Sequence, residues 1–175
     1  MVEAIIRKVG PEDAYEYAAN HIACWKAAYT GIISDEYLSN MSVEQMADRN
    51  LAALTDQSAI RYYCMEYDGK MIGRLVFGAG RDEDKPGAAE IAAMYLLDSF
   101  WYKGYGRQMM EFSVCELQYM CYSEVFLWVL EANDRAKRFY EKCGFVFDGA
   151  AREYNIDTPQ RIVRYTRSLE ALHLG

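Results

Sequence analysis

The sequence has few of the residues on which metal sites and disulfide frameworks depend. Its 175 residues include two histidines, His21 and His173, and five cysteines, an odd number without a CxxC pair. Two histidines leave too few nitrogen ligands for an ordinary zinc site, and the cysteine pattern is typical of reduced thiols. We therefore expect no bound metal and no disulfide scaffold.

Long apolar runs and a surplus of basic residues are also missing. No run approaches the roughly 20 apolar residues that cross a bilayer, and the opening MVEAIIRKVG lacks the pattern of a signal peptide. We therefore expect a cytoplasmic protein without membrane or nucleic-acid partners. The net charge is −7, and the acidic excess lies within residues 1–100. This favours a cationic partner, although solubility alone explains such a charge.

What the sequence does contain is an alternation of strand and helix patterns along the whole chain. Strands are predicted near residues 3–9, 60–67, 70–79, 88–97, 124–130, 145–156 and 161–168. Helices are predicted near residues 11–30, 42–54, 104–121 and 133–143, with a short one near 35–40. The run at 88–97 is apolar on both faces after Glu90, which predicts a buried central strand.

The order β-α-α-β-β-β-α-β-α-β-β contains no linker and no internal repeat. It predicts one α/β (α+β) domain over residues 1–175. We expect a central, mixed and mostly antiparallel sheet of about seven strands, flanked by about four helices.

A glycine-containing loop, SFWYKGYGRQMM at residues 99–110, joins a predicted strand to a predicted helix. Gly104 and Gly106 allow a ligand to approach the backbone, and Lys103 and Arg107 add positive charge. Helix N-termini favour anions, so the loop suits a phosphate or pyrophosphate. An ordinary strand-to-helix turn is the alternative. Neither the Walker A pattern nor the dinucleotide-binding pattern is present.

A second motif, LWVLEANDRAKRFYEKCGF at residues 127–145, supplies Asn133, Ala136, Tyr140 and Gly144 at set spacings. The two motifs, in this order, resemble those of the GNAT superfamily of acetyl-CoA-dependent N-acetyltransferases, and the resemblance covers nearly the whole chain. The segment ACWKAAYTGIISDEYL, residues 23–38, is similar to a bacterial subgroup of that family. Trp101 and Tyr102 depart from the family's loop pattern, which leaves the acyl-chain preference open.

The resemblance implies acetyl-CoA as cosubstrate and a role for each matching residue. Met94, Tyr95 and Leu96 would lie along pantetheine, where the sheet of the family splays open, and Asn133 would hydrogen-bond the cofactor arm. Tyr140 would lie near the sulfur and protonate the leaving thiolate. The pyrophosphate would be bound by the backbone amides of Tyr102, Lys103, Gly104, Tyr105, Gly106 and Arg107. Core packing for Tyr140 and helix capping for Asn133 are the alternatives.

The attacking amine must lose a proton, and Glu90 is the best candidate for the base because partial burial would raise its pKa. A solvated acid at the strand end is the alternative, and Glu131 is a weaker candidate base. Family members that modify ribosomal proteins often carry a glutamate where this chain has Trp128. Trp25 and Tyr29, one helical turn apart, are predicted to face the acceptor, with core packing as the alternative.

The function predicted from these observations is transfer of acetyl from acetyl-CoA to a primary amine of a small molecule or peptide. The amine would attack directly in a ternary complex, without a covalent enzyme intermediate. A non-catalytic module that binds or senses acyl-CoA is the alternative. A homodimer is a further expectation from the resemblance.

Overall fold

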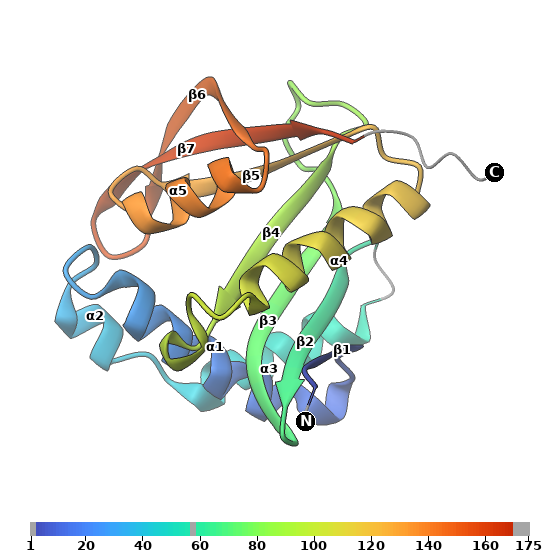
Figure 1. Ribbon diagram of the computed structural model, residues 1–175. Helices are drawn as coiled ribbons and strands as arrows, with labels where there is room; N and C mark the ends of the chain where they lie inside the picture. The colour runs from blue at the N-terminus through green and yellow to red at the C-terminus, as the bar shows by residue number, and fades with distance from the viewer. Residues whose placement is uncertain (1–2, 57–58, 170–175) are drawn as a thin grey trace. The chain divides into compact units, whose positions relative to one another are not determined.

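The structure is a computed structural model that describes residues 3–56 and 59–169. Two short 3₁₀ turns, Pro11–Asp13 and Asp98–Phe100, accompany the helices and strands. In chain order (Figure 1) these are β1 (Ile5–Lys8), α1 (Ala14–Tyr29), α2 (Asp35–Ser39), α3 (Val43–Thr55), β2 (Arg61–Tyr67), β3 (Lys70–Ala79), β4 (Ala89–Leu96), α4 (Tyr105–Tyr119), β5 (Glu124–Leu130), α5 (Asp134–Lys142), β6 (Val146–Asn155) and β7 (Pro159–Ser168).

The strands form one seven-stranded sheet in the order β1-β2-β3-β4-β5-β7-β6. β4 and β5 are parallel, whereas the pairs β1/β2, β5/β7 and β6/β7 are antiparallel. The predicted mixed, mostly antiparallel sheet is therefore confirmed. The predicted number of helices is also confirmed, with the five-residue α2 as the short additional helix.

Within this fold the chain forms two compact units. Unit 1 comprises Met1–Val76 and Ala93–Met109, and unit 2 comprises Phe77–Ala92 and Met110–Gly175. Among the described residues, no helix is both long and apolar enough to cross a membrane.

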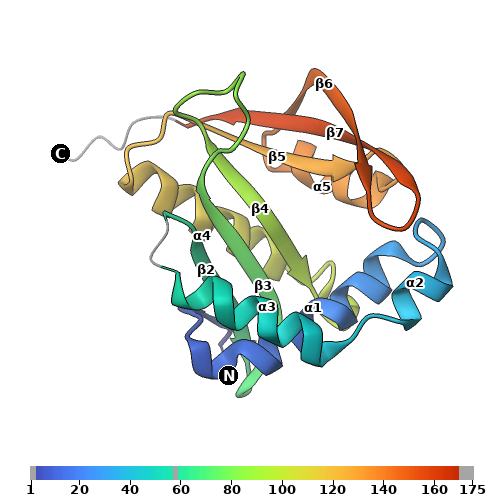
Figure 2. The same ribbon diagram turned by 180° about the vertical axis from the view of Figure 1, so that it is seen from behind.

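In unit 1, α1 and α3 cover one face of β2 and β3 (Figures 1 and 2). Polar side chains of α1 also bond to the strand backbone: Asn20 donates to the carbonyl of Met71 at 3.1 Å, and the Tyr17 hydroxyl to that of Leu75 at 3.3 Å. Ser42 caps α3, since its hydroxyl accepts from the Gln45 amide at 3.2 Å. These contacts fix α1, which carries Trp25 and Tyr29, against the strands.

A tight Asp-Gly turn joins the neighbouring strands β2 and β3. Asp68 and Gly69 have φ values of 51° and 69°, the signature of a type I′ turn. In such a turn both central residues need positive φ, which the Asp-Gly pair tolerates well.

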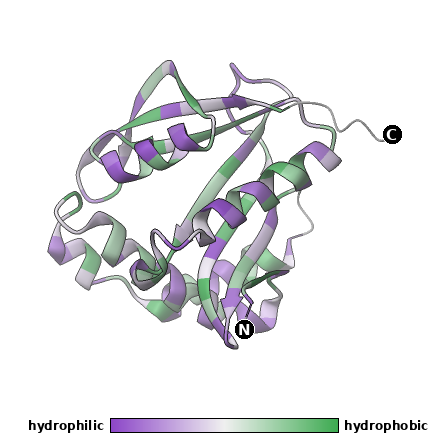
Figure 3. Cartoon of the chain, in the orientation of Figure 1, coloured by the Kyte–Doolittle hydropathy of each residue, from purple (hydrophilic) through white to green (hydrophobic). Residues whose placement is uncertain are grey.

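In unit 2, α5 lies over strands β5 and β7 (Figure 1). Its end is tied to β7: Tyr165 donates to Glu141 at 3.0 Å, and Arg167 donates to the carbonyl of Cys143 at 2.8 Å. Gly144 follows with φ of 84°, a conformation that ends helices. The helix is largely hydrophilic (Figure 3), so it presents charge to the solvent and a few apolar residues to the strands.

The predicted central position of β4 is confirmed, since it is the fourth of the seven strands, but the strand is buried over only part of its length. Ala89, Glu90 and Ile91 are buried, but Ala92 is exposed and residues 93–96 are half-buried. The parallel register with β5 joins Ala89 to Val125 and Glu90 to Phe126, which are the buried positions. An apolar sequence does not reveal where along a strand the pairing with its neighbour stops.

Candidate active site

The predicted phosphate loop belongs to unit 1 and connects β4 to α4. Tyr102 and Gly104 have φ values of 60° and 91° and flank Lys103. Residues whose backbone alternates between negative and positive φ direct their amides into a shared concavity that suits anions. The helix α4 begins at the next residue, Tyr105, and its first amides have no partner within the helix. The local backbone therefore has the form of an anion site.

The loop is also open to an incoming ligand. Tyr102 is 90% exposed, and Lys103, Gly104 and Arg107 are exposed as well. A Cβ placed on Gly104 would meet no atom within 4 Å, so the strain of a substitution there would come from its positive φ. Gly106 is the second residue of α4. The exposure, charge and backbone conformation of the loop thus fit a pyrophosphate.

The tryptophan that departs from the family pattern holds this loop in place. The Trp101 indole donates to the carbonyl of Leu96, at the end of β4, at 2.8 Å. Phe100 and Tyr105 pack edge-to-face with each other and with Tyr67, with ring centroids 5.6–5.9 Å apart. Aromatic contacts thus fix the start of α4.

The predicted pantetheine segment, Met94–Leu96, forms the half-buried end of β4. β3 packs closely beside it: a Cβ on Gly73 would lie 2.8 Å from the Tyr95 carbonyl oxygen. A glycine is therefore required at that point of β3. The Leu96 carbonyl already accepts from Trp101 and keeps a second lone pair for another donor.

The predicted acceptor residues Trp25 and Tyr29 lie together in unit 1 with His21 and Tyr95, and we call these four residues the aromatic cluster. Trp25 stacks on His21 and meets Tyr29 edge-to-face, with centroids 5.1 Å and 5.0 Å apart. The Tyr29 and Tyr95 hydroxyls are hydrogen-bonded at 3.0 Å. Tyr29 is buried, whereas Trp25 and Tyr95 are half-buried. Burial raises the pKa of Tyr95, while the Tyr29 hydroxyl, Arg74 and the Trp25 indole oppose the rise.

A buried arginine that the sequence analysis missed adjoins this cluster. Arg74 on β3 is 6% exposed, contacts Nδ1 of His21 at 2.5 Å and lies 4.2 Å from the Tyr17 ring centroid. Burial and the Arg74 charge lower the pKa of His21 to about 3, so its ring is neutral near pH 7. The signal for Arg74 was present, since it is a lone charge within the apolar run MIGRLVFGA.

Asn133 and Tyr140 belong to unit 2 and lie on one face of α5, about 10 Å apart along its axis. Asn133 is buried and caps the helix, because its side-chain oxygen accepts from the Ala136 amide at 3.1 Å. The alternative of helix capping is therefore confirmed, although the cap uses only the oxygen of the side-chain amide. Tyr140 is half-buried and packs against Phe139 and Phe145, with centroids 5.5 Å and 6.1 Å apart.

Glu90, also in unit 2, is not the solvated acid that was the alternative to a base. It is 5% exposed, and Arg81 donates to both carboxylate oxygens, at 2.9 Å and 2.8 Å. The carboxylate in turn raises the pKa of Arg81. The sequence analysis missed Arg81, which follows β3 in a charged loop and gives no local sign of its partner.

The remaining candidates of unit 2 have structural partners. Glu131 is exposed and accepts from Arg161 at 3.1 Å. The Trp128 indole donates to Asp82 at 2.9 Å, and Arg152 lies 4.0 Å from the centre of the Trp128 ring system.

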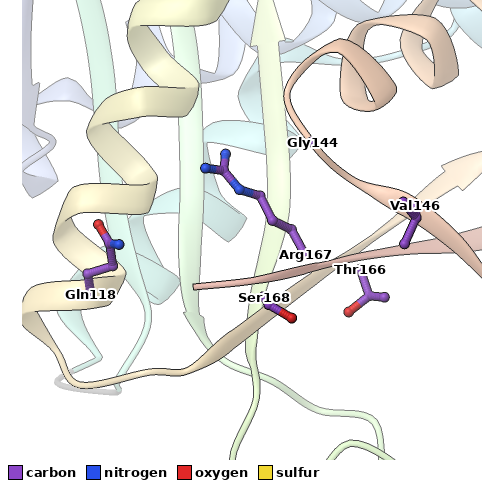
Figure 4. A pocket seen from close by; sticks show the side chains of 6 residues that line it. All are labelled: Gln118, Gly144, Val146, Thr166, Arg167 and Ser168. Carbon is purple, nitrogen blue, oxygen red and sulfur yellow. The ribbon is translucent and has the colours of Figure 1, made fainter. Parts of the chain in front are cut away.

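A pocket of about 500 Å³ in unit 2 contains none of the predicted site residues. It is lined by Gln118, Gly144, Val146, Thr166, Arg167 and Ser168 (Figure 4). The Arg167 side chain lines this pocket, and its hydrogen bond to the carbonyl of Cys143, at the end of α5, explains where the side chain lies. Within the described part of the chain, no three His, Cys, Asp or Glu side chains are placed to hold a metal; His173 lies outside that part.

The chain is similar to several known proteins. It is 29% identical to a probable N-acetyltransferase of Mycobacterium tuberculosis over 146 residues, 82% of this chain and 80% of the relative. It is 26% identical to an uncharacterized N-acetyltransferase of Bacillus subtilis over 132 residues, 73% and 72% of the two chains. The structure of the PaiA N-acetyltransferase of Thermoplasma acidophilum, determined with coenzyme A, superposes with a TM-score of 0.73 at 20% identity, over 95% of this chain and 99% of that one.

The sequence model of the Acetyltransferase (GNAT) family matches residues 25–145, which include the phosphate loop, Glu90, Asn133 and Tyr140. This match covers more than half of the chain. The protein therefore belongs to the GNAT family of acetyltransferases, and is an acyltransferase.

Proposed function

We propose that the protein moves an acetyl group from acetyl-CoA to a primary amine of a small molecule or peptide, and that residues 1–175 act as one catalytic domain. The observation that carries this proposal is the exposed loop of alternating φ at Tyr102–Gly104, directly before α4. Membership of an acetyltransferase family and the coenzyme A in a related structure support it. A homodimer and a cytoplasmic location stay predictions.

The chain offers backbone amides and a few side chains to hold the cosubstrate. The amides from Tyr102 to Arg107 bind the pyrophosphate, helped by the charges of Lys103 and Arg107. The backbone of Met94–Leu96 lies along pantetheine. Asn133 donates a side-chain N–H to the cofactor arm while its oxygen keeps the cap of α5.

The bound cosubstrate supplies an acetyl thioester, which an amine can attack with loss of a thiolate. In our proposal the Tyr140 hydroxyl donates the proton that this thiolate needs. A phenol, near pH 10, can donate to a thiolate, near pH 8.5, when both are held within hydrogen-bond reach. Its packing between Phe139 and Phe145 limits the rotation of the Tyr140 ring and so helps to aim the hydroxyl.

Glu90 takes the proton that the attacking amine must lose. Both of its oxygens already accept from Arg81, but a carboxylate has about four lone-pair sites, so each oxygen can accept a second bond. Arg81 itself is 69% exposed at its side chain and can move away from Glu90. The aromatic rings of Trp25 and Tyr29 offer flat apolar surface to the acceptor, and the acidic excess of residues 1–100 favours one with an ammonium group.

The experiment is a thiol-release assay with acetyl-CoA and a panel of primary amines. We expect release that depends on the amine, and a fall in kcat of about 100-fold or more for Tyr140→Phe. Tyr119→Phe is the matched control, because Tyr119 is 80% exposed on α4 and its hydroxyl has no assigned role. Full turnover by Tyr140→Phe with every acceptor would remove Tyr140 from the mechanism. Acetyl-CoA binding without transfer to any amine would reject the enzymatic function.

A further inference from the structure

Arg74 is a buried cation for which the described residues supply no counterion. Its described contacts are His21, which is neutral, and the face of the Tyr17 ring. Among residues 3–56 and 59–169, no carboxylate forms an ion pair with it. A buried charge without a counterion is costly, and proteins normally pair such a group or use it to bind a ligand.

Two buried donors in this region also lack acceptors. In the described part of the chain, the Arg74 Nε and the Trp25 indole nitrogen are the buried side-chain polar atoms without a hydrogen-bond partner. The Trp25 indole lies near enough to the Tyr95 hydroxyl to oppose the rise of its pKa, but it forms no well-aligned hydrogen bond with that hydroxyl. Both residues contact the His21 ring: Trp25 stacks on it, and Arg74 is hydrogen-bonded to its Nδ1. Unpaired buried donors are rare enough to need an explanation. Both atoms require an acceptor, and one of them carries a positive charge.

The surroundings of these donors reach the surface of unit 1. Trp25 and Tyr95 are half-buried, whereas Tyr29, His21 and Arg74, which contact members of the same cluster, are buried. An oxygen that approaches past the half-buried rings would meet a guanidinium and an indole N–H. A carboxylate has two acceptor oxygens and a negative charge, and thus supplies what both donors lack.

We propose that Arg74 and Trp25 bind a carboxylate of the acceptor, so that the acceptor is a primary amine that also carries a carboxylate, such as an amino acid. This inference rests on the proposed function and narrows its substrate class. The positive charge of Arg74 selects the carboxylate, and the flat rings of the aromatic cluster favour an acceptor with an apolar or aromatic side chain. A polyamine, which has no negative group, leaves Arg74 uncompensated.

The test compares pairs of amines that differ by the carboxylate alone: phenylalanine with phenethylamine, and lysine with cadaverine. We expect the wild type to prefer the carboxylate-bearing member by about tenfold or more in kcat/KM, the effect of one charge-assisted contact. Arg74→Met is expected to lose this preference, and Arg74→Lys to keep part of it. Arg161→Met, which removes an exposed arginine from unit 2, is the matched control and is expected to keep the preference in full.

A binding measurement distinguishes failure of this inference from failure of the proposed function. Phenylalanine should raise the thermal unfolding midpoint of the wild type but not that of Arg74→Met, whether or not transfer occurs. Should Arg74→Met not fold, Trp25→Phe removes the other donor and is expected to weaken the preference. A wild type that favours phenethylamine and cadaverine, or shows no preference and no stabilisation, would mean that the donors hold only water. A preference that survives both Arg74→Met and Trp25→Phe would also overturn the inference.

Discussion

Unit 1 and unit 2 each bury one arginine almost completely, and the two differ in how its charge is balanced. Arg164 of unit 2 is 5% exposed and contacts Asp82, Asp84 and Asp148 at 2.9, 2.6 and 2.7 Å. Arg74 of unit 1 is 6% exposed and contacts a neutral imidazole and an aromatic ring. The two arginines are therefore about equally buried, but among the described residues only Arg164 has carboxylates that balance its charge.

In our proposal, the comparison distinguishes an arginine with a structural role from an arginine that binds a ligand. Asp82 and Asp84 belong to the loop between β3 and β4, so Arg164 on β7 anchors this loop inside unit 2. Arg81 and Glu90, at the two ends of the same segment, are held by their own bidentate pair. Three carboxylates compensate the charge of Arg164, whereas in our proposal a carboxylate of the acceptor compensates that of Arg74.

The largest expected effect is on Arg164. Arg164→Met leaves three carboxylates without their common partner and is expected to lower the free energy of unfolding by about 3–5 kcal/mol. Arg74→Met removes an uncompensated charge and is expected to change it by less than about 1 kcal/mol, in either direction. Urea unfolding of both variants checks this. Equal losses would show that Arg74 is as structural as Arg164.

A pH dependence is expected from the histidine beside Arg74. The pKa of His21 is about 3 in the folded protein and 6.5 in the unfolded chain. Between these values the unfolded chain binds more protons, so stability falls as the pH decreases from 6.5 toward 3, by at most about 1.4 kcal/mol per pH unit.

The variant His21→Gln should reduce that slope, because glutamine does not titrate. The measurement is urea unfolding at several pH values between 7 and 4, compared between wild type and variant. Since acidic residues titrate in both proteins, the difference between the two curves reports on His21. Parallel curves would contradict a buried neutral His21.

A smaller effect is expected from the two indoles. Trp128 donates to the Asp82 carboxylate, whereas the Trp25 N–H has no partner in the described structure. Trp128→Phe should therefore lower the free energy of unfolding by about 1.5–3 kcal/mol more than Trp25→Phe does, because a hydrogen bond to a charged group contributes that much. The difference between their urea midpoints is the readout, and a larger loss for Trp25→Phe would reverse the comparison.

The smallest effect is expected at the surface of unit 2. Arg161 and Glu131 form an exposed pair, with side chains 62% and 50% exposed. Such pairs contribute little, so Arg161→Met should change the free energy of unfolding by less than about 0.5 kcal/mol. A loss comparable to that of Arg164→Met would show that burial does not decide the strength of these pairs.

Local signals allowed much of the fold to be predicted. The Asn133 cap and the β5 strand, for example, follow from residues that are close together in the chain. The half-buried end of β4 did not follow, because the extent of its pairing with β5 depends on residues about 36 positions away. The helix predicted near residues 104–121 ends at Tyr119, and Cys121 beyond it is exposed with φ of 65°.

The candidate site was predicted only in part, because contacts between residues that are far apart in the chain leave no local pattern in the sequence. The phosphate loop and the Asn133–Tyr140 face of α5 are local patterns, and motif spacing was enough to select them. Arg74 and His21 are 53 residues apart in the chain, and only the packing of α1 on β3 brings them together. Arg81 and Glu90 are nine residues apart, but their pairing requires the ends of β3 and β4 to meet. No periodicity in the sequence encodes such contacts.

The binding of acetyl-CoA tests the central claim most directly, by calorimetric titration of the wild type, Gly104→Val and Gly69→Val. Both glycines have positive φ and open space where a Cβ would lie, so the two substitutions introduce similar backbone strain. We expect saturable binding of one acetyl-CoA per chain to the wild type and to Gly69→Val, and affinity at least about tenfold weaker for Gly104→Val, whose side chain obstructs the loop amides. Absence of saturable binding to the wild type, or equal binding by all three proteins, would contradict the claim that this loop holds the cosubstrate.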